Sequence, residues 1–197
     1  PTSTERQLEL CGRLLDEHPG VYLQSHVAEN RGEVAWVAEL YPWSRSYLDV
    51  YDHYGLLRPR AVYAHCIHLD AADRQRMAAT GAAMSFCATS NLFLGRGLFD
   101  VGAAHAAGVR VGLGTDVGGG TSLSMLRTLD EAYKVTQLAG HKLTPLRAFY
   151  LATLGGAAAV GLDERIGSFD VGKEADFVVL DPAATPLLAR RLASAES

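Results

Sequence analysis

The segment VYLQSHVAEN, residues 21–30, decides the fold because it joins a short apolar run to a histidine and a glutamate. The run at residues 21–23 predicts a buried strand, and His26 and Glu29 follow where a loop or helix begins. A single His-x-x-Glu pair has a simple structural explanation. An imidazole can bond a backbone carbonyl, and a glutamate in a first helical turn complements the helix dipole. The other strands decide whether this pair carries chemistry.

The composition is that of a globular protein and excludes two classes of partner. The 197 residues are 48% hydrophobic and 20% charged, which suffices for a sizeable core. The formal net charge is -4 and the basic residues are scattered, so we expect neither nucleic acid nor an anionic membrane as a partner. No apolar run approaches the about 18 to 20 residues of a membrane span, and no signal peptide is evident at the start. We therefore expect a cytoplasmic protein.

The cysteines indicate neither a disulfide framework nor a thiolate metal site. Cys11, Cys66 and Cys87 are odd in number and have no CxxC spacing. We expect buried thiols that pack as small hydrophobic side chains.

Strands and helices alternate along most of the chain. Thr2 and Glu5 form the capping box expected to open the first helix, and Asp70 and Gly81 are the caps expected for a later one. Short, continuously apolar strands between helices are typical of parallel βα units, in a doubly wound sheet or in a barrel. The predicted strands are residues 21–25, 61–64, 82–87 and 109–113, and the predicted helices are residues 2–17, 29–40, 44–54, 70–80, 99–107 and 122–137.

The positions of the polar residues favour a barrel. His26, His65, the run CATSN at residues 87–91 and Asp116 each follow the C-terminal end of a different predicted strand. In a (β/α)8 barrel those strand ends converge on one mouth, where the active site is built. We therefore predict an α/β fold in which four strands make half of a (β/α)8, TIM-type barrel.

The pattern changes towards the C-terminal end. Thr-Pro at residues 144–145 is typical of a helix start, and the glycines at 155–156 predict that this helix breaks. Residues 177–180 predict one more strand, but no helix follows it to continue the series. We therefore expect a barrel-type domain over residues 1–165 and a tail over residues 166–197 that belongs to another layer.

Three polar residues at these strand ends are candidate metal ligands. A catalytic zinc ion takes nitrogen and carboxylate ligands, about three from the protein, and keeps a position open for water. His26, His65 and Asp116 each have a structural explanation when taken alone, as hydrogen-bonded histidines and an Asx-turn residue. These separate explanations account poorly for the position of all three residues at the same end of the predicted strands. That shared position favours a metal site. His68 is the competing ligand, although it falls past the strand end.

The remaining histidines and the glycine run receive structural interpretations. We expect His18, His53, His105 and His141 to be structural or exposed. The run GGGTS at residues 118–122 lacks the spacing of a phosphate-binding loop, so we interpret it as a flexible turn that lets the backbone pass close to a ligand.

Six segments together resemble guanine deaminases of the amidohydrolase superfamily. They occur in the family's order and run through nearly the whole chain, and the combination of the third with the fourth is the most specific. The segments are QSHVAEN (24–30), YAHCIHL (63–69), SFCATSNLFLGRGLF (85–99), VGLGTDVGGGTSLSM (111–125), ATLGGAAAVGL (152–162) and IGSFDVGKEADFVVLDP (166–182).

The resemblance implies a ligand set for one zinc ion. In the family the ion is bound by a His-x-His pair on the first barrel strand, a histidine on each of the fifth and sixth strands, and an aspartate on the eighth. His26, His65 and Asp116 match the fifth-, sixth- and eighth-strand ligands, and Glu29 matches the glutamate that shuttles protons. This sequence departs from the family in having no His-x-His and no upstream guanine-binding arginine.

The same resemblance implies strands five to eight, the C-terminal half of a longer enzyme. From Ile166 onward it implies a return into a small β-sandwich built jointly with N-terminal residues. The complete enzyme is then expected to be a homodimer, and these 197 residues alone are expected to be inactive.

The implied reaction is the hydrolytic deamination of guanine to xanthine and ammonia. Asp116 would take the proton of the attacking water, Glu29 would protonate the ring nitrogen, and His65 would hold and polarise the attacking oxygen. The zinc deaminases of the cytidine-deaminase class use H-x-E and P-C-x-x-C, and neither motif occurs here.

Two alternatives stay open at this point. Other amidohydrolases, such as triazine chlorohydrolases or thioadenosine and adenosylhomocysteine deaminases, share the metal ligands, and the residues after the eighth strand, here VGGGTS (117–122), discriminate among them. The chain could also be a non-catalytic remnant or a subunit of a split enzyme, a reading that rests on its length.

Overall fold

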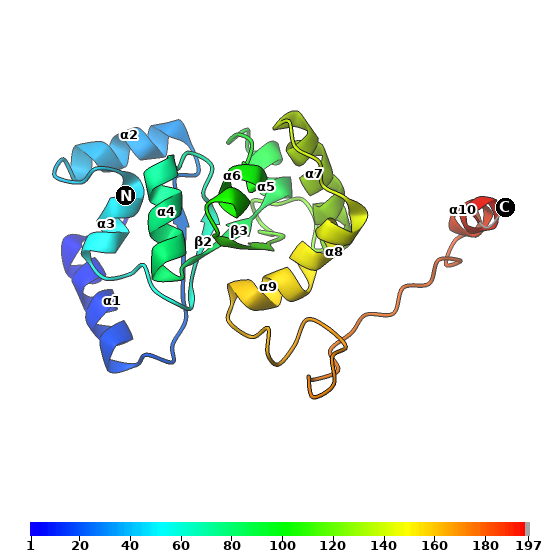
Figure 1. The fold of residues 1–197 in the computed structure, drawn as a ribbon. Coiled ribbons are helices and arrows are strands. Elements are labelled where there is room, and N and C mark those ends of the chain that lie inside the picture. Colours follow the sequence, from blue (N-terminus) through cyan, green and yellow to red (C-terminus); the bar gives the residue numbers. More distant parts are fainter. Residues whose placement is uncertain (196–197) are drawn as a thin grey trace.

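A parallel sheet forms the centre of the computed structural model, which describes residues 1–195 (Figure 1). The four strands lie in the order β1-β2-β3-β4, and each pairs in parallel with its neighbour in sequence. A doubly wound sheet reverses its strand order at a switch point, whereas a barrel wall runs in sequence order. The sheet therefore has the order of a barrel wall. The strands are β1 (Leu23–Val27), β2 (Ala61–His65), β3 (Ala83–Phe86) and β4 (Arg110–Leu113).

Helices connect these strands as the alternation predicted, with one addition. The short helix α5 occupies most of the CATSN segment, which was expected only as a strand end. The helices are α1 (Glu5–Glu17), α2 (Arg31–Leu40), α3 (Tyr47–His53), α4 (Ala71–Thr80), α5 (Ala88–Phe93), α6 (Val101–Ala106), α7 (Met125–Leu138), α8 (Pro145–Ala152), α9 (Leu154–Ala159) and α10 (Pro186–Ala195). Within residues 1–195, none of them is both long and apolar enough to cross a membrane.

Helix caps explain several of these boundaries. Asp70 caps α4 through a reciprocal pair of hydrogen bonds with Asp73, and Gly81 ends the helix with φ of 74°, as predicted. The capping box predicted at Thr2 is wrong. Thr4 caps α1 instead, because its hydroxyl accepts from the backbone N–H of Gln7 at 3.3 Å while its own N–H donates to the Gln7 side chain at 2.8 Å.

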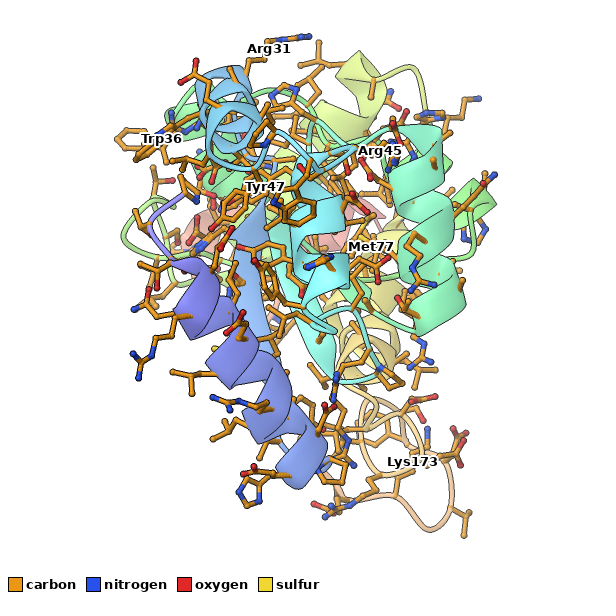
Figure 2. The ribbon with its side chains drawn as sticks, turned by 90° about the vertical axis from the view of Figure 1, so that its left-hand side faces the viewer. Arg31, Trp36, Arg45, Tyr47, Met77 and Lys173 are labelled. Carbon is orange, nitrogen blue, oxygen red and sulfur yellow. The ribbon has the colours of Figure 1, made fainter. Side chains whose placement is uncertain are left out.

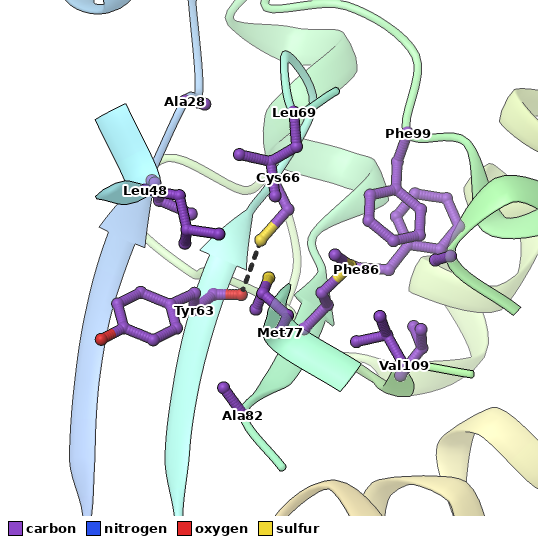
Figure 3. Packing of buried hydrophobic residues seen from close by; sticks show 14 of the residues in the cluster. Ala28, Leu48, Tyr63, Cys66, Leu69, Met77, Ala82, Phe86, Phe99 and Val109 are labelled. Atoms are coloured by element: carbon purple, nitrogen blue, oxygen red, sulfur yellow. Dashed lines mark hydrogen bonds between the residues drawn. The ribbon is translucent and has the colours of Figure 1, made fainter. Parts of the chain in front are cut away.

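The main core lies between the sheet and the helices on one of its faces. In Figure 2, α3 with the labelled Tyr47 lies in front of the first strands, and α4 with the labelled Met77 lies beside them. Figure 3 shows the packing around Tyr63, Met77 and Phe86, which are fully buried, and the hydrogen bond of 3.3 Å from the Cys66 thiol to the Tyr63 carbonyl. Phe86 stacks on Phe99 with ring centroids 4.7 Å apart. This core packing holds the strands in place, and with them the strand ends that carry the polar residues.

Two of the three cysteines have the predicted environment. Cys66 and Cys87 are buried, and burial raises the pKa of both thiols, so they pack as neutral side chains. Cys11 is exposed on α1, which contradicts the expectation that it is buried.

The glycine pair predicted to break a helix lies inside a helix instead. The break falls at Thr153, between α8 and α9, and Gly155 and Gly156 lie inside α9. A Cβ built on Gly112 of β4 would lie 3.1 Å from the Cα of Gly156. The absence of side chains therefore lets α9 approach the strand closely.

The C-terminal segment differs from the prediction. Phe177–Leu180, expected as a strand, is exposed and pairs with no strand among residues 1–195. A β-strand requires a partner for its backbone groups, so the sequence pattern alone does not form one. After this segment comes α10, which sequence analysis did not predict and which lies apart from the sheet in Figure 1. The composite β-sandwich over residues 166–197 stays a prediction, and its last two residues lie outside the described part.

Candidate metal centre

The structure brings the three predicted ligands together at the C-terminal edge of the sheet. His65 is the last residue of β2 and Asp116 follows β4. The strand β1 extends two residues further than predicted, so His26 lies within it and not after it. One candidate ligand atom from each of these side chains lies within 4.8 Å of the other two. Two imidazoles and one carboxylate are donors that zinc accepts, and three is the usual ligand number of a catalytic site.

His65 is the most constrained member of this cluster. Its side chain is 2% exposed, and its Nδ1 lies 2.8 Å from Oδ1 of Asn91 on α5. Because an amide oxygen only accepts hydrogen bonds, Nδ1 carries the proton and Nε2 keeps its lone pair. That Nε2 lies 3.9 Å from Oδ2 of Asp116 and 3.9 Å from Oε2 of Glu29. Asn91 therefore sets the tautomer in which His65 can bind a metal.

The His26 ring lies nearly parallel to the His65 ring. Their centroids are 5.3 Å apart and the planes differ by 15°. The hydroxyl of Tyr51, from α3, donates to the His26 carbonyl at 3.1 Å. Stacking on His65 thus orients the His26 imidazole, and both rings lie at the sheet edge where Asp116 lies.

The glycine run after β4 holds Asp116 in place. Asp116 has φ of 47°, and its carbonyl accepts a hydrogen bond from the N–H of Gly120. A Cβ on Gly120 would overlap the Thr115 carbonyl oxygen, and one on Gly119 would lie 3.0 Å from Oδ2 of Asp116. The run therefore lets the backbone fold tightly around the carboxylate itself, whereas sequence analysis expected it to approach a ligand.

Glu29 lies beside the cluster and has a charged partner. Its carboxylate is 17% exposed, and Oε1 accepts a hydrogen bond from Nε of Arg96 at 3.0 Å. The other oxygen, Oε2, faces His65 as described above. Glu29, the predicted proton shuttle, therefore lies next to the space between the three candidate ligands.

Sequence analysis missed two residues of this site. Asn91 lay in a polar run that was noted at a strand end, but its contact with His65 depends on the unpredicted helix α5. Arg96 lies in the quoted segment SFCATSNLFLGRGLF, but its pairing with Glu29 gave no signal, because the two residues are 67 positions apart in the chain. His68, the competing ligand, is not in the cluster, and its Nε2 bonds the Arg96 carbonyl at 3.1 Å.

Comparisons with known proteins show what the whole chain is similar to. The chain is 52% identical to guanine deaminase of Escherichia coli (strain K12) over 187 residues, which are 95% of the chain and 43% of that protein. The solved E. coli guanine deaminase has a TM-score of 0.96 at 50% identity, over 98% of this chain and 45% of that one. An adenosine deaminase from Xanthomonas campestris, solved with bound zinc, has a TM-score of 0.85 at 30% identity over 93% of this chain and 42% of its own.

The matched region is nearly the whole chain but under half of each of these relatives. The sequence profile of the amidohydrolase family matches residues 1–196. The parallel sheet, the cluster at its C-terminal edge and this match lead to one conclusion: the chain belongs to the amidohydrolase family.

Proposed function

We propose that this chain is part of a guanine deaminase, which converts guanine and water to xanthine and ammonia. The observation that carries the proposal is the convergence of His26, His65 and Asp116, with Glu29 beside them, at one edge of the sheet. That convergence occurs in a chain 52% identical to a guanine deaminase over 95% of its length. The substrate is therefore a purine base.

The four strands make up half of an eight-stranded barrel in this proposal. Both β1 and β4 have one edge without a partner strand among residues 1–195. A groove of about 580 Å³ lies beside β4 and is lined by residues of α6, α8 and α9, including Val101, Tyr150 and Ala158. Parallel sheets are almost always covered on both faces, and a barrel has no free strand edge, so these features favour further strands. The assignment to strands five to eight stays a prediction.

A zinc ion fits the donor set and would be held by His26, His65 and Asp116. When bound, zinc supplies Lewis acidity that lowers the pKa of a water molecule from about 15.7 to about 7. The protein moves the protons: Asp116, whose side chain is 28% exposed, accepts one from the attacking water. Glu29 delivers one to the ring nitrogen beside the attacked carbon. The buried imidazole of His65 would hold the ion through Nε2, because its Nδ1 donates to Asn91.

The role of Asn91 gives a prediction about metal affinity. Asn91→Ala removes the acceptor that fixes the His65 tautomer, so we expect metal affinity to fall by about 10- to 100-fold. A competition titration with a zinc chelator measures the change. Ser90→Ala is the matched control, because Ser90 is equally buried on the same helix but its hydroxyl donates to the Cys87 carbonyl and not to His65. Unchanged affinity in Asn91→Ala would remove this residue from the metal site.

The test of the proposed function uses the complete enzyme that contains this chain. Xanthine and ammonia should form from guanine, chelation should abolish the activity, and zinc should restore it. The same assay with triazines, thioadenosine and adenosylhomocysteine discriminates between members of the family, whose loop after the last strand is here VGGGTS (117–122). Faster turnover of any of these than of guanine would contradict the proposal. The homodimer and the cytoplasmic location stay predictions from sequence.

A further inference from the structure

The loop after α5 places a guanidinium group on the Glu29 carboxylate. Nε of Arg96 donates to Oε1 of Glu29 at 3.0 Å, while Oε2 of the same carboxylate lies 3.9 Å from Nε2 of His65. The two oxygens therefore have different environments. One is held by the arginine, and the other is left directed towards the candidate metal centre.

The backbone of Arg96 is held on both sides. Its N–H donates to the Asn91 carbonyl at 2.8 Å, and its own carbonyl accepts from Nε2 of His68 at 3.1 Å. The next residue, Gly97, has φ of 135°, and a Cβ there would lie 2.9 Å from the side chain of Ile67. Glycine thus lets the loop lie close against the segment that follows β2. The guanidinium approaches Glu29 from a fixed position.

We propose that Arg96 is a positioning residue that holds the Glu29 carboxylate in the orientation for proton transfer, with His68 fixing the Arg96 loop. The proposal rests on the proposed function, in which Glu29 moves the proton. A glutamate side chain has several rotamers, and a displacement of about 1 Å can lower a rate by on the order of 10²-fold. Both partners are partly exposed, at 34% for Arg96 and 17% for Glu29, so the ion pair contributes little to stability.

The kinetic test compares variants of the complete enzyme. Arg96→Ala should lower kcat for guanine by about 10- to 100-fold, with KM and zinc content near the wild-type values. Arg96→Lys should recover part of this loss, and so should added guanidinium ion with Arg96→Ala. Arg58→Ala is the matched control, since Arg58 is exposed to a similar extent, at 27%, and pairs with Asp16 at 2.8 Å far from the cluster. It should leave kcat unchanged.

Three kinetic results would overturn the proposal. A raised KM with unchanged kcat would make Arg96 a substrate-binding residue, and an equal loss in Arg58→Ala would make the effect one of general stability. Unchanged kinetics would show that Glu29 needs no partner. A test without guanine compares crystal structures of the wild type and Arg96→Ala, in which Glu29 should leave its place near His65. If the wild type makes no xanthine, the proposed function fails, and an unmoved Glu29 in this comparison would still overturn the role of Arg96.

Discussion

Glu29→Gln in the complete enzyme should lower guanine turnover by about 10² to 10⁴-fold while leaving the zinc content unchanged. An amide cannot take up and release a proton as a carboxylate does, but it has nearly the same shape. Its oxygen can still accept the hydrogen bond that Arg96 donates to Oε1. The variant therefore removes proton transfer and keeps the position of the side chain, which separates this effect from that of Arg96→Ala.

Glu33→Gln is the control for this prediction. Glu33 lies on α2 and accepts hydrogen bonds from the Glu29 N–H at 3.0 Å and from the Tyr47 hydroxyl at 2.9 Å. Its side chain is a carboxylate like that of Glu29, but in the described part of the chain it forms no ion pair with His65. Guanine turnover and zinc content should stay close to wild type in this variant. Near-normal turnover in Glu29→Gln would remove Glu29 from the mechanism.

The parts of the fold that depend on local interactions were predictable from sequence. Helix α4 begins after Asp70 and ends before Gly81 because both caps act within a few residues. The clustering of His26, His65 and Asp116 was predictable for a different reason. The C-terminal ends of parallel strands lie at one edge of a sheet, so residues at those ends meet even when they are far apart in the chain.

The errors arose where a local signal was ambiguous or where a partner was distant. Thr2 is followed three positions later by Glu5, and Thr4 by Gln7, so the sequence offers two capping boxes and only the fold selects the second. Residues 177–180 have the composition of a strand, but strand formation depends on a neighbour as much as on composition. The ion pair of Arg96 with Glu29 depends on the tertiary structure alone.

The second large effect concerns the chain by itself, which should convert no measurable guanine even with zinc present. Within residues 1–195, one edge of β1 and one edge of β4 have no partner strand, and such edges invite association with other chains. Gln24 and His26 are exposed on the strand face opposite the main core. The chain also has no His-x-His to complete the family's ligand set. Purified residues 1–197 should therefore form dimers or aggregates, which their mass in solution will show. A monodisperse monomer with the turnover of a complete enzyme would contradict this prediction.

Supplying the part of a guanine deaminase that this chain does not match should restore the activity. We would co-produce the chain with the part of E. coli guanine deaminase that it does not match, since 52% identity over 95% of the chain favours correct docking. The pair should elute together and form xanthine, because the added strands cover the open edges and supply the absent ligands. His65→Ala in this chain should abolish the recovered activity and lower the zinc content of the pair, since it removes a buried candidate ligand. If the recovered activity survives His65→Ala, then His65 is not a metal ligand of the active site. The proposed centre would be wrong.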